Sequence, residues 1–290
     1  MQTTTPNRNY KDSVFVDLFS EDEKAQENFV SLYNALHSTQ LTSSTALKPL
    51  RLEQVMYMSF YNDVSYLVED KIIVLAEHQS TINPNMPIRC LEYIVRIYEQ
   101  LYDSKEKYSR QLLTIPTPEF YVFYNGIKPC PKNYTLKLSD SFITKIKQPQ
   151  LELYVEVINI NSDMHHTLLE KCPPMHEYSL FVKTVREHKE KDTVSGFQKA
   201  INECIQNNIL KEYLQRKTKE VLNMLLAEYD YETDIAVQRA EERKIAFAEG
   251  IERGSRRKAL ETAKLMRDAH CDISFIEKMT GLSKEDVEKL

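Results

Sequence analysis

The chain has 290 residues, of which 42% are hydrophobic and 28% are charged, and its formal net charge at pH 7 is −5. This length accommodates one sizeable core with an appendage, or two small domains, and the composition is that of a globular protein. Without an apolar run of about 18 residues, no membrane-spanning helix is expected, and the N-terminal stretch does not resemble a signal peptide. Five widely spaced cysteines without a CxxC pair favour reduced thiols in a cytoplasmic protein over disulfides or structural zinc.

The acidic balance disfavours a non-specific nucleic-acid binder, although a local basic groove on an acidic body remains compatible with it. The chain contains five glycines and neither a GxGxxG nor a GxxxxGK[ST] motif. A nucleotide-cradling loop is therefore not expected.

Hydrophobic periodicity predicts a helix at the N-terminus, then three consecutive strands, a helix, and further strands. Beyond about residue 163 the pattern is helical to the end. We therefore expect an α/β fold with a mixed sheet flanked by helices and a helical C-terminal region. The predicted helices are 11–38 and 88–103, and the predicted strands are 50–60, 63–68, 71–79, 117–126, 134–138 and 151–160.

The expected organisation is a core over 1–162, a helical extension over 163–227, a long helix over 228–268 and a two-helix tail over 269–290. The long helix would measure about 60 Å at about 1.5 Å per residue, which favours self-association or an extended arm.

Two acids lie near the facing ends of the second and third strands. A two-residue loop at Glu69 and Asp70 would place Asp63 and Glu77 on opposite faces of the sheet, whereas a three-residue connection centred on Asp70 pairs them directly. The second register also aligns six apolar residues on one face, so it is the better solution. They are Val64, Tyr66 and Val68 opposite Ala76, Val74 and Ile72.

Directly opposed carboxylates destabilise a sheet unless a cation compensates them. Hard oxygen ligands at adjacent positions suit Mg²⁺, with Mn²⁺ or Ca²⁺ as alternatives. The opposing interpretation is that Asp63 and Glu77 are solvent-facing acids at strand ends. His78 should point away from both acids, which indicates a structural histidine.

An acid early in one strand followed by Glu77-x-Gln79 at the end of the next resembles the PD-(D/E)XK nuclease superfamily. The wider text resembles its transposase-associated branch, the Rpn family of recombination-promoting nucleases, over roughly residues 10–230. The matching segments are "KDSVFVDLF", "LYNAL", "NDVSYLV", "LAEHQSTINPNMPIRCLEYIVRIYE", "PTPEFYVFYNG" and "LELYVEVININ".

This resemblance implies a restriction-endonuclease-like core and a metal-dependent DNA endonuclease, with Asp63 and Glu77 as metal ligands. It also implies that Gln79 occupies the place of the usual lysine, where glutamine can donate only a neutral hydrogen bond. An acid from the first helix commonly completes such sites. Asp12 is the candidate, with Asp17 and Glu27 as competitors, and an N-cap is the other interpretation of Asp12.

Arg89, Tyr93 and Arg96 form a stripe that suits phosphate binding, with solvated surface arginines as the alternative. Arg256, Arg257 and Lys258 form a basic cluster on the long helix, either as a DNA-backbone contact or as a solvated face.

The tail predicts two short helices broken at Gly281, with Ser274 and Ser283 as N-caps. It resembles a helix-turn-helix, but its second helix is poor at reading bases, which favours a structural or protein-binding hairpin. DNA is the expected partner, and self-association through the C-terminal helices is a further expectation. The rival function is a catalytically silent DNA- or protein-binding protein of the same fold.

Overall fold

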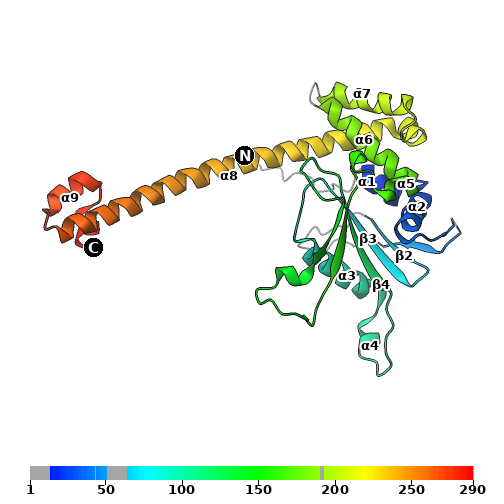
Figure 1. Ribbon diagram of the computed structural model, residues 1–290, viewed down its shortest axis with the longest axis horizontal. Coiled ribbons are helices and arrows are strands. Elements are labelled where there is room, and N and C mark those ends of the chain that lie inside the picture. The colour runs from blue at the N-terminus through cyan, green and yellow to red at the C-terminus, as the bar shows by residue number, and fades with distance from the viewer. Residues whose placement is uncertain (1–13, 43, 51–63, 190–192, 290) are drawn as a thin grey trace. The chain divides into compact units, whose positions relative to one another are not determined.

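The computed structural model describes residues 14–42, 44–50, 64–189 and 193–289. The chain divides into two compact units, one up to Glu228 and one over Tyr229–Leu290, and each is described by itself. The first unit contains the sheet and the helices that cover it (Figure 1).

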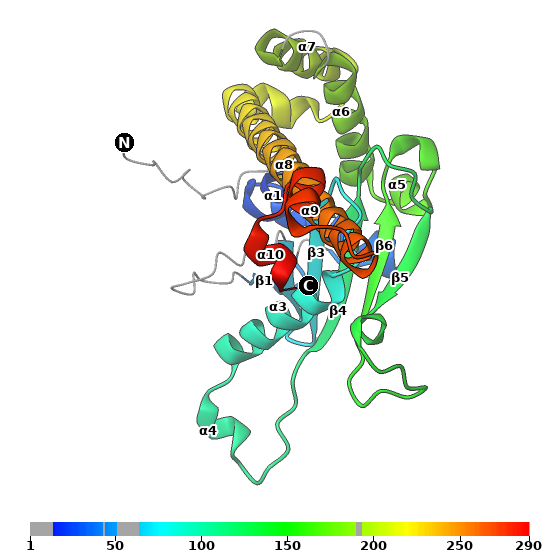
Figure 2. The ribbon, with the colours of Figure 1, turned by 90° about the vertical axis from the view of Figure 1, so that its left-hand side faces the viewer.

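The sheet built by the described residues has six strands in the order β1-β2-β3-β4-β6-β5 (Figure 2). Two of its pairings, β3–β4 and β4–β6, are parallel, and the others are antiparallel. The predicted mixed sheet is therefore confirmed. Its strands are β1 (Leu47–Pro49), β2 (Val64–Val68), β3 (Ile72–Gln79), β4 (Thr117–Tyr124), β5 (Asn133–Lys137) and β6 (Tyr154–Asn159). Most of the strand predicted over 50–60 lies outside the described residues.

The hairpin between β2 and β3 has the predicted register. Val64 pairs with Ala76 and Val68 with Ile72, which is the register of a three-residue connection. Glu69 and Asp70 both take positive φ angles, of 49° and 56°. The amide of Lys71 closes the turn on the carbonyl of Val68 at 3.0 Å. Because side chains alternate between the faces of a strand, this register decides which residues are buried together.

Each face of the sheet is covered by helices. One face packs on α3 (Met86–Leu101) through a cluster of buried side chains that includes Leu67, Leu75, Ile97 and Val122. The other face, which carries Tyr66, packs on α2 (Ala25–His37), where the Phe29 and Tyr66 rings stack at 4.1 Å. Buried apolar surface on both faces is what holds the three layers together.

The predicted N-terminal helix is interrupted. A short α1 (Val14–Val16) continues into a π-helical turn at Asp17–Glu21, and α2 starts only at Ala25. The amide of Asp22 donates to the carbonyl of Asp17 at 2.8 Å, and Asp22 is extended, with ψ of 155°. Periodicity alone did not reveal this break, because apolar spacing continues through it.

The remaining helices confirm the predicted helical half. Helix α8 begins at Lys211, earlier than the predicted 228, and consists of two helical segments that meet at Lys217, whose φ and ψ are −116° and 27°. No helix among the described residues is long and apolar enough to cross a membrane. The other helices are α4 (Ser104–Lys107), α5 (Thr167–Lys171), α6 (Pro173–Lys189), α7 (Thr193–Gln206), α9 (Ile273–Thr280) and α10 (Lys284–Glu288).

The C-terminal unit has its own small core. Ala263, Ile276, Leu282 and Val287 are buried together. Gly281 ends α9 with φ of 70°, and Ser283 caps α10 by accepting from the amide of Asp286. These two features match the predicted tail. The prediction for Ser274 was wrong, since the N-cap of α9 is Asp272 and Ser274 lies inside the helix.

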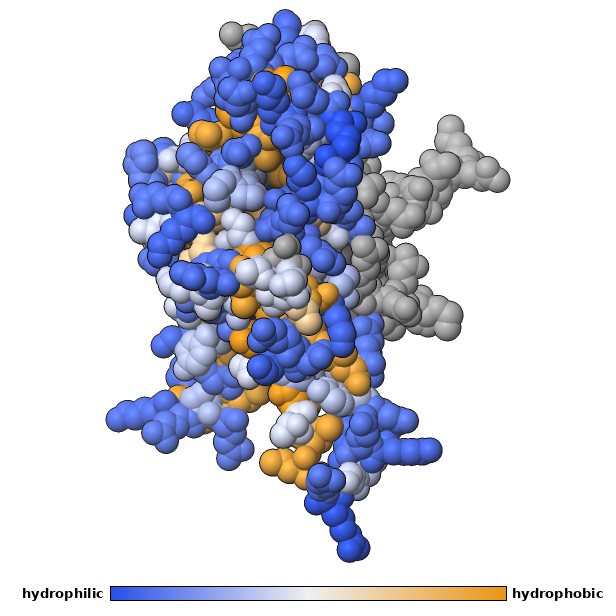
Figure 3. All heavy atoms as spheres, turned by 90° about the vertical axis from the view of Figure 1, so that its right-hand side faces the viewer, coloured by the Kyte–Doolittle hydropathy of each residue, from blue (hydrophilic) through white to orange (hydrophobic). Residues whose placement is uncertain are grey.

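The face drawn in Figure 3 is mainly hydrophilic, with hydrophobic side chains in patches between the polar ones. All five cysteines are free thiols, as predicted.

Candidate functional site

Glu77 lies near the carboxyl end of β3, opposite Val122 of the parallel strand β4. Its exposed fraction is 3%. It shares a face with Leu75 and Ile73, so it points toward α3, where the surrounding side chains are largely apolar. A carboxylate in such a position is unfavourable unless it is paired or hydrogen-bonded.

Arg89 on α3 provides this pairing. Its Nη2 lies 3.1 Å from Oε2 of Glu77. The same guanidinium donates to the Tyr93 hydroxyl from Nη2 at 2.6 Å and from Nε at 3.2 Å. Tyr93 is 2% exposed, and its ring lies beneath the guanidinium at 5.6 Å from Cζ to the centroid. Two consecutive turns of α3 thus position one cation against the acid of β3.

The predicted stripe of Arg89, Tyr93 and Arg96 therefore divides. Tyr93 is buried against the sheet, and Arg89 reaches Glu77. Arg96 lies on the exposed side of α3 and pairs with Glu99 at 3.1 Å. The structure brings Arg89 to the candidate site and leaves Arg96 on the surface.

Gln79 follows Glu77 on the same face of β3. Its Nε2 donates to the sulfur of Met86 at 2.7 Å. Nη1 of Arg89 contacts the same sulfur at 3.3 Å. Burial, followed by the charge of Glu77, raises the pKa of the nearby Cys90 thiol to about 12, so this cysteine stays protonated at neutral pH.

The other two acids of the predicted site, Asp63 and Asp12, lie outside the described residues. Among the described residues no group of three or more His, Cys, Asp or Glu side chains could hold a metal ion. What is described supplies one buried carboxylate and a neighbouring amide. Oxygen donors of this kind fit Mg²⁺, which binds few protein ligands and keeps several waters. The fit to a divalent cation depends on a second acid, for which Asp63 is the predicted residue.

Asp17, an alternative candidate for the third acid of the site, is bonded to two residues outside the site. Its carboxylate accepts from the Tyr213 hydroxyl at 2.8 Å and from Nζ of Lys217 at 2.9 and 3.0 Å. Burial, followed by the charge of Asp17, raises the pKa of Tyr213. Glu27, the other competitor, is exposed on α2.

Asp22 belongs to the same acidic and basic cluster, which sequence reasoning did not find. Its carboxylate is held by Arg216 at 2.6 and 2.8 Å and by Lys217 at 3.3 Å. Burial raises the pKa of Asp22, but hydrogen bonds from the Lys24 amide, Arg216 and Lys217 outweigh it, so the pKa lies below 3.8. The partners are almost 200 positions apart in the chain, and no local pattern links them.

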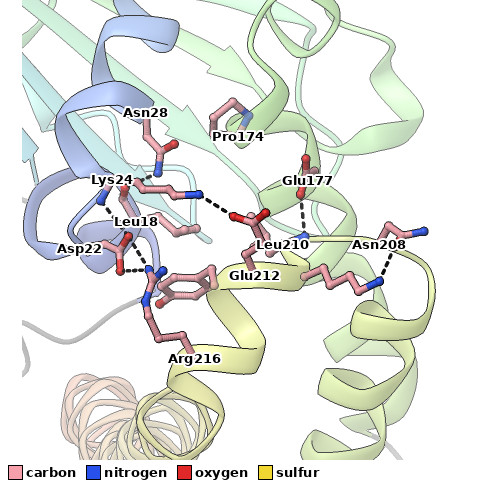
Figure 4. A pocket seen from close by; sticks show the side chains of 12 residues that line it. Leu18, Asp22, Lys24, Asn28, Pro174, Glu177, Asn208, Leu210, Glu212 and Arg216 are labelled. Carbon is pink, nitrogen blue, oxygen red and sulfur yellow. Dashed lines mark hydrogen bonds and ion pairs between the residues drawn. The ribbon is translucent and has the colours of Figure 1, made fainter. Parts of the chain in front are cut away.

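This cluster borders a cavity of about 340 Å³ that lies between α2, α6 and the start of α8 (Figure 4). Lys24 and Glu212 pair at 2.5 Å, and Glu177 accepts from the amide of Leu210 at 2.6 Å. These charged groups satisfy one another. We therefore interpret the cavity as part of the packing between these helices, and Glu77 is not among its lining residues.

His78 points to the opposite face from Glu77, as predicted. Its ring stacks on Phe15 at 5.2 Å between centroids, and Nε2 lies 3.2 Å from the Tyr178 hydroxyl. Burial, followed by the charge of Arg186, lowers the pKa of His78 to about 4. The side chain is therefore neutral at pH 7.

Polar groups that sequence reasoning did not select gather at the carboxyl ends of the parallel strands. Arg186 of α6 donates to Asn125 and Asn161, which follow β4 and β6. The amide of Asn125 donates to the carbonyl of Gln79 at 2.9 Å. A Cβ on Gly126 would meet the carbonyl oxygen of Ser80 and the ring of Tyr124. The "YNG" sequence predicted a turn at this point, but it did not indicate that Arg186 would hydrogen-bond to the turn.

The predicted basic cluster lies in the C-terminal unit. Arg256 is 3.6 Å from Asp286, and Arg257 is 3.9 Å from Glu261. Lys258 is exposed. All three side chains are at the surface, and the two arginines have acidic neighbours.

The fold and the position of Glu77 define a class: an α/β protein whose mixed sheet, flanked by helices, is consistent with a nuclease-like core. The chain belongs to the family described as "Putative transposase, YhgA-like", whose family model matches residues 9–235. It is also 24% identical, over 263 residues, to the recombination-promoting nuclease RpnA of Escherichia coli strain K12, covering 83% of this chain and 84% of RpnA. No solved structure matches the chain. The family resemblance predicted from the sequence is thereby confirmed.

Proposed function

We propose that this protein is a metal-dependent endonuclease that cleaves phosphodiester bonds of DNA in recombination or transposition. The observation that carries the proposal is the buried carboxylate of Glu77 at the end of a central strand, next to Arg89 and Gln79. The family and the similarity to RpnA support a nuclease- or transposase-like role.

In this proposal Glu77 and Asp63 hold Mg²⁺, with Mn²⁺ or Ca²⁺ as alternatives, and Asp12 completes the acidic set. The bound cation would activate water and offset the charge that develops on the phosphate. Gln79 orients the attacking water through a hydrogen bond, and the attack on phosphorus is in line with the leaving oxygen. Arg96, Arg256, Arg257 and Lys258 would contact the DNA backbone, because their side chains lie at the surface.

The second candidate is a catalytically silent protein that binds DNA or another protein with the same fold. Two observations favour it: Gln79 is neutral, and the carboxylate of Glu77 is already paired with Arg89. We place the protein in the cytoplasm under either function, with self-association through the C-terminal helices.

The test is cleavage of supercoiled plasmid by the full-length protein in Mg²⁺, Mn²⁺, Ca²⁺ or EDTA. Asp63→Asn and Glu77→Gln should each abolish metal-supported cleavage while circular dichroism stays unchanged. Asp70→Asn is the matched control, because Asp70 is an acid in the same hairpin whose ion pair with Lys48, at 2.8 Å, is exposed at the surface. No cleavage by the wild type with any metal would contradict the endonuclease and favour the silent protein. Full activity in Glu77→Gln would contradict the role of Glu77 as a metal ligand.

A further inference from the structure

Glu77 places a negative charge in a nearly buried position, and a phosphodiester approaching the same place brings a second one. Gln79 cannot offset either charge, because an amide is neutral. Arg89 is the described cation that touches Glu77, at 3.1 Å, and it comes from α3 rather than from β3. Within the described part of the chain, the cation recorded beside Glu77 thus comes from helix α3.

The guanidinium of Arg89 has a second anchor besides Glu77. Its Nε and Nη2 both donate to the hydroxyl of the buried Tyr93. A guanidinium has five N–H donors in a fixed planar arrangement. The bond from Nε to Tyr93 does not use the Nη2 that contacts Glu77, so Arg89 can turn away from Glu77 and keep this bond. Its side chain is 35% exposed, against 4% for Glu77, so it also reaches the solvent side of the site.

Arg89 and Gln79 converge on one atom. Nη1 of Arg89 and Nε2 of Gln79 lie 3.3 and 2.7 Å from the sulfur of Met86. The end of the residue 79 side chain is thus a close neighbour of the guanidinium. A lysine at position 79 would therefore place its ammonium close to the present position of the Arg89 guanidinium.

We propose, as an extension of the proposed function, that Arg89 is the phosphate-binding cation of this site and doubles as the counter-ion of Glu77. Arg89 neutralises Glu77 in the metal-free protein. With Glu77 engaged by a divalent cation, the Arg89 guanidinium would bind the phosphate of the substrate while Tyr93 holds it in place. Arginine suits this second role, because its planar group binds phosphate oxygens in pairs.

The first experiment measures Mn²⁺ affinity by calorimetry on the metal-free, full-length protein at pH 8. Arg89→Met should bind Mn²⁺ about tenfold more tightly than the wild type, a change equivalent to about 1.4 kcal/mol, because the competing counter-ion of Glu77 is gone. Lys48→Met is the matched control: it removes a cation from an exposed pair with Asp70 and should leave the affinity unchanged. Tighter binding supports the counter-ion role of Arg89, and the cleavage experiment tests its role toward phosphate.

The second experiment relocates the charge. Arg89→Met should slow single-turnover DNA cleavage about 10²-fold, the loss typical of one positioned electrostatic donor. Gln79→Lys combined with Arg89→Met should recover at least tenfold of that loss and return Mn²⁺ affinity to within about threefold of the wild type, because residue 79 then supplies the cation. If Arg89→Met does not fold, the double variant, which keeps a cation beside Glu77, is compared with the wild type directly.

The outcomes separate this inference from the proposed function. Two outcomes overturn the role of Arg89 without touching the proposed function. One is equal Mn²⁺ affinity in the wild type and Arg89→Met. The other is a folded double variant whose cleavage remains about 10²-fold or more slower than that of the wild type. If the wild type does not cleave DNA but Arg89→Met binds Mn²⁺ more tightly than the wild type, the endonuclease is contradicted and the counter-ion role is supported. Absence of Mn²⁺ binding in every variant contradicts both.

Discussion

Glu77 and His78 are neighbours in the chain, but their side chains lie on opposite faces of the sheet, one paired with Arg89 and the other with Tyr178. The strand thus separates a charged residue from a neutral one by alternation alone. We therefore expect different effects from the two side chains: the proposed chemistry depends on the Glu77 face, and the His78 face should affect stability.

On the Glu77 face, Gln79 gives a direct test of mechanism. Gln79→Ala should slow cleavage by about 10²-fold if its hydrogen bond orients the attacking water. Gln79→Lys should preserve or raise the rate, since an ammonium donates hydrogen bonds and offsets charge on the phosphate. The measurement is single-turnover cleavage of one DNA substrate at fixed salt and Mg²⁺. Equal rates for the wild type and both variants would show that Gln79 has no catalytic role.

On the other face, His78 should make stability depend on pH. Its folded pKa of about 4 lies below the ordinary 6.5, so the unfolded chain takes up the proton first as the pH falls. The neutral histidine therefore contributes full stability above pH 6.5, and that stability is lost progressively between pH 6.5 and 4. The loss amounts to about 3 kcal/mol for this difference in pKa.

Urea unfolding at pH 7.5, 5.5 and 4.5 measures this effect. His78→Phe retains a ring against Phe15 and should remove the pH-dependent loss, leaving only a constant offset from the lost contact with Tyr178. The same pH dependence in both proteins would mean that other groups cause it.

The ion pair of Lys217 with Asp17 should be important for stability, because the side chains are only 23% and 9% exposed. Lys217→Met leaves a buried carboxylate without its ammonium and should lower the free energy of unfolding by about 3–5 kcal/mol. Lys24→Met removes the ammonium from a pair whose side chains are 46% and 77% exposed. That control should change stability far less, because water screens an exposed pair. Equal losses in the two variants would contradict the importance of burial here.

Gly126 should not tolerate a side chain. Gly126→Ala brings a Cβ onto the carbonyl oxygen of Ser80 and the ring of Tyr124, and overpacking of this kind costs about 1–3 kcal/mol. Gly250→Ala is the control, because Gly250 lies within helix α8 with no atom within 4 Å of the added Cβ. This second change should stabilise its helix by about 0.5–1 kcal/mol. Thermal unfolding followed by circular dichroism distinguishes the two signs, and a neutral Gly126→Ala would refute the close approach.

The sequence by itself predicted strands β2 to β6 and the faces to which the side chains at the end of β3 point, but not β1 at Leu47–Pro49 or the order of the strands. The register of β2 on β3, with Val64 opposite Ala76, was predicted because side chains alternate along a strand and the three-residue connection places the apolar residues of both strands on one face. The same reasoning placed Glu77 and His78 on different faces. Gly281 and Ser283 marked the boundaries of the tail helices, because left-handed backbone and N-capping are local properties of those residue types.

Only the tertiary structure decided which charged groups meet. In the sequence, Arg89 is one of two arginines on a polar stripe. The packing of α3 on the sheet brings it to Glu77. Lys217 and Asp17 are 200 positions apart, and the break before α2 is stabilised by Arg216, which lies 194 positions from Asp22. Periodicity reports which side of an element is buried, but not what packs against it. The partner of a buried charge is set by how the helices dock, because its desolvation must be offset by whichever opposite charge the fold brings within reach.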